Sequence, residues 1–206
     1  SSKYISNSQG RILNYGKIKP SEKANELSKK FSINNELSEV IIRESDFIFG
    51  GVSGFVIASA DNIMAPNAGI DKSNSQNKLI LYPHNPYLVA EQIKRKFFLD
   101  YSIHVGIIIV DSRLMPARVG TIGIAIACSG IEPVLDRRGT KDLDGNALKV
   151  TFQAIADNLA SIANHKMGEG DEALPLVIIR DSGTKMTDRK ISPKEMTVSH
   201  DECVYV

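Results

Sequence analysis

The sequence predicts a mixed α/β fold of the α+β kind, in which central buried strands are flanked by helices. The most apolar run, Val105–Val110, is apolar on both sides of a strand, which is typical of a strand covered on both faces. Other segments repeat apolar residues at helical spacing, and the two kinds of segment alternate only loosely. No G-x-x-x-x-G-K-[ST] motif occurs and no G-x-G-x-x-G follows a strand, so neither a P-loop nor a dinucleotide-binding fold is indicated.

In the first half of the chain, Tyr4-Ile5 has the character of the end of a strand. Pro20-Ser21-Glu22 then opens a helix to about Phe31, with Ser21 as the N-cap. A second helix is predicted from Asn35 to about Phe47, because its apolar residues share one stripe, and Gly50-Gly51 is expected to end it. The remaining predicted elements are strands at Gly54–Ala58, Ile63–Met64 and Leu79–Tyr82.

In the second half, Asn85-Pro86 starts a helix, because proline is tolerated at the first helical position. Buried strands are predicted at Val105–Val110 and Ile122–Ala127. The longest helix is predicted at Lys149–Met167, and Gly168 stops it. Its predicted core face consists of Phe152, Ile155, Leu159, Ile162 and Ala163. The last predicted strands are a buried one at Leu174–Ile179 and an edge strand at Cys203–Val206.

Composition limits the class of protein. A chain of 206 residues fits a single unit or two intertwined subdomains, which we expect at residues 1–65 with 170–206 and at residues 66–169. The net charge of +1 argues against recruitment to nucleic acid or to an anionic membrane. No apolar run approaches the roughly 20 residues that span a bilayer, and no signal peptide is visible. Cys128 and Cys203 lack C-x-x-C spacing, which indicates reduced thiols in a cytoplasmic protein, with Cys128 buried and inert.

Two acidic turns carry the chemistry that the sequence suggests. Asn67–Asn74 places the carboxylate of Asp71 beside a serine hydroxyl and the amide of Asn74, which suit a divalent cation and a nucleotide. Asp111-Ser112 directly follows the most apolar run, at the open end of a predicted strand. A simple Asx turn at Asp71 and a turn cap at Asp111 are the alternatives. Because each turn closes a strand, we expect the two carboxylates to meet at a metal site on one sheet edge.

Basic residues surround the second turn. Arg113 and Arg118 flank Pro116, and guanidinium groups near carboxylates can hold the oxygens of a transferring phosphoryl group. Solvated loop charges are the alternative. The loop Asp136–Gly145 lacks the final glutamate of an EF-hand, which argues against calcium and leaves an anion site or a salt-bridged structural loop. The four histidines show no metal-ligand spacing, and no G-x-S-x-G elbow is present.

In this order, the motifs resemble the coenzyme F420-0:gamma-glutamyl ligase family over nearly the whole chain. Asn67–Asn74 is similar to that family's N-A-G-[IV]-D-x-S-N, and Asp111–Gly120 to its D-T-x-x-R-P-W-R-x-G. Asp136–Gly145 resembles its D-x-R-G-x-x-D-x-x-G segment. The first residues, through Gly10-Arg11, resemble its N-terminal strand and turn, and Ile42–Ser45 resembles its helix.

The resemblance implies a ligase that joins L-glutamate to F420-0 with GTP as co-substrate and a divalent metal, magnesium or manganese, with potassium as a further cation to consider. GTP would phosphorylate a substrate carboxylate, and the glutamate amine would displace phosphate. By motif, Asp71, Asp111 and Ser112 are the expected metal ligands, and Asp71, Asp111 and Arg118 the expected catalytic residues. Ser2 and Asn74 are expected to touch the nucleotide. The resemblance also implies the ligase fold, an intertwined homodimer and no nucleic-acid or membrane partner.

The chain departs from the family pattern at several positions. Ser112 replaces a threonine, Met115 and Ala117 replace an arginine and a tryptophan, and Asn7 falls where a nucleotide-site lysine is expected. The family's Gly-Leu-Pro-Glu-Ile phosphate loop would lie before residue 1, so we expect residues upstream of Ser1. These departures keep open a non-catalytic or altered-substrate relative that binds metal or nucleotide, and a dimer-forming scaffold with relic turns.

Overall fold

The computed structural model of the chain describes residues 1–72 and 78–205. The chain divides into two compact units. Unit 1 comprises Ser1–His84, Arg113–Thr121 and Thr197–Val206, and unit 2 comprises Asn85–Ser112 and Ile122–Met196. Both units combine helices with strands, which confirms the predicted mixed α/β class. Whether two chains intertwine stays a prediction.

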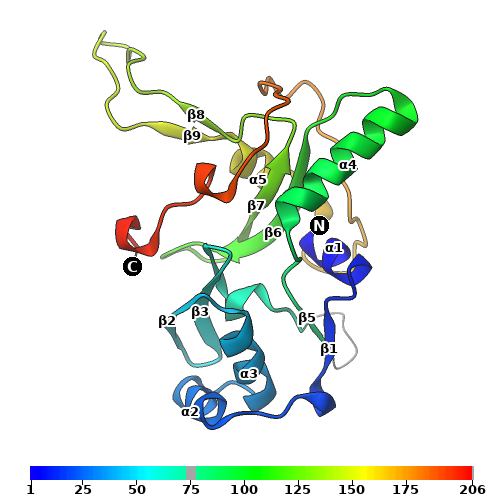
Figure 1. Ribbon diagram of the computed structural model, residues 1–206. Helices are drawn as coiled ribbons and strands as arrows, with labels where there is room; N and C mark the ends of the chain where they lie inside the picture. The colour runs from blue at the N-terminus through cyan, green and yellow to red at the C-terminus, as the bar shows by residue number, and fades with distance from the viewer. Residues whose placement is uncertain (73–77, 206) are drawn as a thin grey trace. The chain divides into compact units, whose positions relative to one another are not determined.

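Unit 1 contains two small antiparallel sheets and three helices (Figure 1). In β1–β5, Ile12 lies opposite Ile80, and in β2–β3–β4, Phe47 lies opposite Ser59 and Ala60 opposite Ile63. In chain order its helices and strands are α1 (Ser2–Ser8), β1 (Ile12–Asn14), α2 (Glu22–Phe31), α3 (Asn35–Glu44), β2 (Phe47–Val52), β3 (Phe55–Ala60), β4 (Ile63–Pro66) and β5 (Lys78–Ile80). Short 3-10 turns lie at Tyr15–Lys17, Asn67–Gly69 and His200–Glu202.

Local signals place several of these elements correctly. The side chain of Ser21 accepts a hydrogen bond from the backbone N–H of Ala24, so it caps α2 as predicted. The β3–β4 hairpin turns through Asp61 and Asn62, which both have positive φ, as a two-residue hairpin loop requires. Apolar residues of α3, β3 and β5 then form one core, in which Leu37, Ile41, Val56 and Leu79 are fully buried.

Two predictions for unit 1 are wrong. Residues Ser2–Ser8 form a helix and not the end of a strand; Ser2 and Ser6, four positions apart, share its buried face. The second helix ends at Glu44, and Phe47–Val52 forms a strand. Pairing with β3 overrides the helical pattern there, and Gly50 and Gly51 lie inside the strand, where Gly50 marks a bulge.

The described residues of unit 2 combine two pairs of strands with two longer helices (Figure 1). β6 pairs with β7, and β8 pairs with β9 in an antiparallel hairpin. In chain order the elements are α4 (Pro86–Tyr101), β6 (Ile107–Leu114), β7 (Thr121–Ser129), β8 (Val134–Asp136), β9 (Phe152–Ala154) and α5 (Ile155–Met167), followed by a 3-10 turn at Pro193–Glu195. The predicted helix start at Asn85-Pro86 is confirmed, as is the stop at Gly168, which has φ +75°.

The structure corrects the predicted strands of the second half. β6 starts at Ile107 and runs to Leu114, so Asp111 and Ser112 lie inside the strand and not in a loop after it. Only Ile109 and Val110 of the predicted buried run are fully covered, because β6 pairs with one strand in the described part of the chain. Leu174–Ile179 is extended but belongs to no strand. Residues 203–205 form no strand, and Val206 lies outside the described residues.

The helix predicted at Lys149–Met167 is also shorter than expected, and α4 is longer than it. Phe152 is committed to β9, where it pairs with Asp136 and is exposed. The buried face of α5 consists of small residues, Ala156, Ala160 and Ala163, whereas Ile162 is exposed. Small side chains permit closer packing of the helix than the predicted larger ones would.

Cys128 lies in the core of unit 2, as predicted for a buried thiol. It is 1% exposed, and burial raises its pKa to about 12, so it stays a neutral, inert thiol near pH 7. No helix in residues 1–72 and 78–205 has the length and apolar character needed to cross a membrane.

Candidate active site

A strained turn in unit 1 holds the first predicted site. Asn67, Ala68 and Gly69 follow β4 with φ values of +52°, +55° and +70°. Left-handed backbone is costly for Ala68, since it has a Cβ. The turn is fixed from outside, because Asn67 Oδ1 accepts a hydrogen bond from Val56 N–H at 3.1 Å. A Cβ at Gly69 would lie 2.2 Å from the ring of Tyr82, so only glycine fits there.

This turn delivers Asp71 to a defined place. The backbone of Asp71 exchanges two hydrogen bonds of 2.9 Å with Ile80, which extends the β5 edge by one bridge. Its carboxylate forms an ion pair with Lys3 from α1, and the Asp71 side chain is 21% exposed. A carboxylate held on a rigid backbone and partly open to solvent is suited to binding a cation.

Lys3 is a neighbour that the sequence reasoning missed. It follows Ser2, the predicted nucleotide contact, on α1. Ser2 itself is 3% exposed, so the group of the helix that reaches the carboxylate is the lysine ammonium. The position next to a motif residue was the signal that could have identified it. Asn74 and Ser73 lie outside the described residues.

Asp111 and Ser112 lie on β6 at the end of a unit 2 segment. Ser112 N–H donates a 2.9 Å hydrogen bond to Asp111 Oδ1, and both residues are half-buried. Asp71 belongs to unit 1, so the convergence of the two carboxylates stays a prediction. The roles of Asp71 and Asp111 as metal ligands and catalytic residues also stay predictions.

The arginines after Ser112 differ in their surroundings. Arg118 ends a turn in which its N–H donates to Met115 C=O at 3.2 Å, and its side chain is exposed. Arg113 is half-buried, and its Nε is fully buried with no hydrogen-bond partner among the described residues. Arg118 is therefore free to reach into solvent, whereas Arg113 faces the protein interior.

Two of the predicted site residues have side chains of the type that binds a hard divalent cation. Asp71 and Asp111 offer carboxylate oxygens, and Mg²⁺ is commonly held by one or two carboxylates together with phosphates and waters. Within the described residues, no group of three or more His, Cys, Asp or Glu side chains is arranged to hold a metal ion. The donor chemistry thus suits a metal that arrives with a phosphate-bearing substrate.

The Asp136–Gly145 loop extends the β8–β9 hairpin and is satisfied internally. Arg138 pairs with Asp136 at 2.6 Å and lies over the Phe152 ring, 4.6 Å from its centroid. Hydrogen bonds from Arg138 lower the pKa of Asp136 to about 2. Asp142 accepts hydrogen bonds from the N–H groups of Asp144 and Asn146. This pattern favours the salt-bridged structural loop over the anion site.

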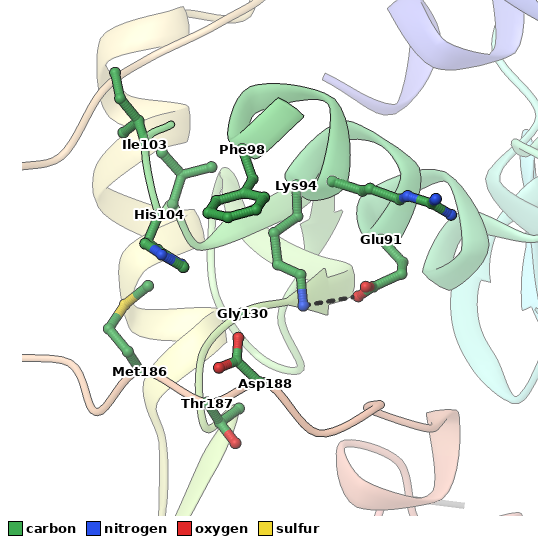
Figure 2. A pocket seen from close by; sticks show the side chains of 11 residues that line it. Glu91, Lys94, Phe98, Ile103, His104, Gly130, Met186, Thr187 and Asp188 are labelled. Carbon is green, nitrogen blue, oxygen red and sulfur yellow. Dashed lines mark ion pairs between the residues drawn. The ribbon is translucent and has the colours of Figure 1, made fainter. Parts of the chain in front are cut away.

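A recess of about 610 Å³ in unit 2 is a second candidate site (Figure 2). Figure 2 shows the Lys94 ammonium, the His104 ring and the Asp188 carboxylate pointing toward the same space. Lys94 Nζ pairs with Glu91 at 3.1 Å, and Glu91 also accepts a hydrogen bond from the Ser129 hydroxyl. These contacts, the Ser129 bond first, lower the pKa of Glu91. A recess with both charge signs is suited to a small zwitterion.

Comparison with known proteins places the chain in a family. The family model described as F420-0:Gamma-glutamyl ligase matches residues 1–181. A Coenzyme F420:L-glutamate ligase of Methanocaldococcus jannaschii is 40% identical over 199 residues, which are 94% of this chain and 80% of that protein. Proteins of the same name from Methanococcus maripaludis strain C7 and Methanopyrus kandleri are 36% and 35% identical, over 98% and 85% of this chain and 81% and 71% of their own lengths. The chain therefore belongs to the F420-0:gamma-glutamyl ligase family, a family of enzymes that form carbon–nitrogen bonds.

Proposed function

We propose that this protein is a GTP- and divalent-metal-dependent ligase that adds L-glutamate to coenzyme F420-0 through a gamma-glutamyl linkage. The observation that carries the proposal is Asp71, held by a strained turn in a chain that is 40% identical to a relative named Coenzyme F420:L-glutamate ligase. Backbone strain persists only where its surroundings enforce it, and it concentrates at functional sites.

The proposed reaction has two steps. The γ-phosphoryl group of GTP passes to a carboxylate oxygen of the acceptor, and GDP leaves. The glutamate amine then attacks the activated carbonyl carbon, the amide bond forms, and inorganic phosphate and a proton leave. A bound divalent cation would neutralise charge on the phosphate oxygens.

The chain's own residues would position these groups. Asp71 and Asp111, with Ser112, would hold the cation. Lys3 neutralises Asp71 in the structure. The Lys3 ammonium, next to this carboxylate, would contact a phosphate oxygen of the nucleotide. Arg118, exposed at its turn, would contact the transferring oxygens, and Ser2 and Asn74 the nucleotide.

The proposal also covers assembly and location: a cytoplasmic homodimer. Exposed apolar side chains support the dimer. Leu174, Leu176 and Ile178 are 52%, 65% and 70% exposed along the extended segment, while Val177 and Ile179 pack on the unit 2 core. Sedimentation velocity on the whole chain measures the oligomeric state, and a monomer at micromolar concentration would remove this part of the proposal.

The test is ligation by the whole chain with GTP, manganese, L-glutamate and F420-0, followed by GDP release and by the mass of the F420 product. Asp71→Asn should lower turnover by at least about 100-fold, because a ligating carboxylate is lost. Asp61→Asn is the matched control, since Asp61 lies at an exposed hairpin turn of the same unit, and it should retain wild-type turnover. Equal turnover by both variants would exclude Asp71 from the site.

The second candidate is a relative that binds metal or nucleotide without this turnover. It is motivated by Asn7, Met115 and Ala117, which replace expected family residues. Calorimetry with GTP and manganese distinguishes the two: binding with neither GDP release nor a glutamylated product supports the second candidate, and robust ligation removes it.

A further inference from the structure

A cavity in unit 1 has a largely apolar wall that contains a charged residue. It measures about 390 Å³ and lies along the β2–β3–β4 sheet, the end of β6 and the residues that follow it. Its lining is chiefly Phe49, Ile57, Met64, Pro66, Leu114 and Pro116. Arg113 is the charged residue among the described residues that line it. Apolar walls with few polar groups are characteristic of small-molecule sites, and the volume lies within their usual range.

The guanidinium of Arg113 has a buried donor that no described residue satisfies. Its Nε is buried without a hydrogen bond to any described residue. A guanidinium stays charged at any physiological pH, and a buried donor without an acceptor is costly. The planar fork of arginine matches a carboxylate or phosphate, which can accept two parallel hydrogen bonds. An anionic group of a ligand would therefore supply the hydrogen-bond acceptor that Arg113 Nε lacks among the described residues.

The β2 backbone that lines the cavity is open to a flat group. Gly50 has φ +144°, lies at the β2 bulge and lines the cavity. A Cβ at this position would meet no atom within 4 Å, so space lies directly over the backbone. Glycine inside a strand commonly marks a place where a ligand approaches the main chain closely. The sheet thus offers a flat surface, with the arginine as the anion contact of the same cavity.

The cavity also adjoins the candidate active site within unit 1. Pro66 lines the cavity, ends β4 and immediately precedes the strained turn that leads to Asp71. A ligand held here would lie beside the strand end from which that carboxylate is placed. Met115, which stands where the family pattern has an arginine, lines the same cavity, so Arg113 supplies a positive charge that this position lacks.

We propose that the unit 1 cavity binds the acceptor substrate, a flat heteroaromatic molecule bearing a carboxylate or phosphate, and that Arg113 binds its anionic group. The assignment rests on the proposed function for the identity of the acceptor as F420-0. GTP is the less favoured occupant. A guanine base needs polar groups to pair with its edge, and a triphosphate needs several cations, whereas this wall offers one arginine and the phenol of Tyr205 as polar side chains.

Calorimetry of the whole chain with F420-0 alone, without GTP, metal or glutamate, tests the assignment. Arg113→Gln should weaken F420-0 binding by about 10- to 100-fold, the loss expected for a charge-assisted hydrogen-bonded pair, and should leave GTP affinity unchanged. Arg113→Lys keeps the charge without the fork and should give an intermediate loss. Arg180→Gln, an exposed arginine of unit 2, is the matched control and should bind F420-0 as the wild type does.

Thermal melting separates a binding role from a structural one. Because the buried Nε has no partner to lose, Arg113→Gln should melt at or above the wild-type temperature. A lower melting temperature together with unchanged F420-0 affinity would make Arg113 a structural residue and overturn the assignment. Arg113→Lys keeps the test decisive if the glutamine variant does not fold.

The remaining outcomes distinguish this inference from the proposed function. Ligation that proceeds with equal F420-0 affinity in the wild type and Arg113→Gln overturns the cavity assignment and leaves the ligase standing. Arg113-dependent F420-0 binding without ligation supports the cavity and removes the ligase. A loss of GTP affinity instead of F420-0 affinity assigns the cavity to the nucleotide and overturns the inference, and so does a wild type that binds no F420-0.

Discussion

Unit 1 and unit 2 each contain a recess of small-molecule size, and the two differ at one half-buried basic side chain in each wall. In unit 2, Lys94 is paired with Glu91 (Figure 2), and the carboxylate of Glu91 also accepts a hydrogen bond from the Ser129 hydroxyl. In unit 1, Arg113 faces apolar walls with its Nε unpaired among the described residues. The Lys94 ammonium therefore has a carboxylate partner within the protein, whereas the Arg113 Nε is a buried donor that a ligand can satisfy.

This difference separates charged side chains that stabilise the fold from charged side chains that can bind a ligand. A charge that the protein satisfies contributes to stability, and its removal leaves a partner uncompensated. A buried charge that the protein leaves without a partner costs stability until a ligand binds to it. Charged side chains near a cavity are therefore informative only once their partners are known.

The largest expected change in the free energy of unfolding comes from a glycine substitution in the strained turn of unit 1, compared with one in unit 2. Gly69→Ala adds a methyl group 2.2 Å from the Tyr82 ring at φ +70° and should lower the free energy of unfolding by about 3 kcal/mol. Gly145→Ala in unit 2 is the matched control, because its φ is +86° and its Cβ would meet nothing within 4 Å. It should cost about 1 kcal/mol, from the left-handed backbone alone.

Urea unfolding of both variants measures the difference. Equal losses would mean that Tyr82 moves aside at no cost, and the turn before Asp71 would then not be over-determined by its surroundings.

A second comparison concerns acid stability. Hydrogen bonds from Ser21 and then from Arg43 hold the pKa of Glu39 in unit 1 at about 2, below its value in the unfolded chain. The folded state therefore binds fewer protons than the unfolded one between about pH 2 and pH 4.5. The stabilisation, about 2 kcal/mol, is complete above about pH 5 and is lost as the pH falls toward 2.

Glu39→Gln should remove this pH dependence from urea unfolding curves recorded between pH 3 and pH 7. Glu36→Gln is the control, since Glu36 is a half-buried carboxylate in the first turn of the same helix. If the slope between pH 3 and pH 5 persists in the Glu39 variant, carboxylates of unit 2 such as Glu132, whose pKa is also lowered, dominate acid unfolding.

The sequence specified local features and motif order better than pairing. Ser21, Pro86 and Gly168 begin or end their helices as predicted, because caps and stops act within a few residues. The family motifs could also be found in the sequence, because each motif spans only a few residues. The strand at Phe47–Val52 could not be predicted from local sequence. It forms because these residues pair with β3, and that partner lies outside any short pattern.

The candidate site shows the same limit. Asp71 could be singled out from its motif, but the ion pair with Lys3 depends on how α1 packs, which no short pattern encodes. Asp111 was expected in a loop because the apolar run ends before it, yet hydrogen bonding to β7, not hydrophobicity, sets where β6 ends. The buried Nε of Arg113 likewise emerges only from the fold.

The smallest expected effect sharpens the comparison between paired and unpaired arginines. Arg189 in unit 2 bonds Glu132 at 2.5 Å and also pairs with Glu195. Arg189→Gln removes the ion-pair partner of the largely buried Glu132, and because Arg189 is 44% exposed the loss should be about 1 kcal/mol. Arg113→Gln should lose none. Urea unfolding of the two variants side by side gives the sign of each effect. A destabilised Arg113 variant next to a neutral Arg189 variant would reverse the argument, because the arginine without a partner would then be the one that stabilises the fold.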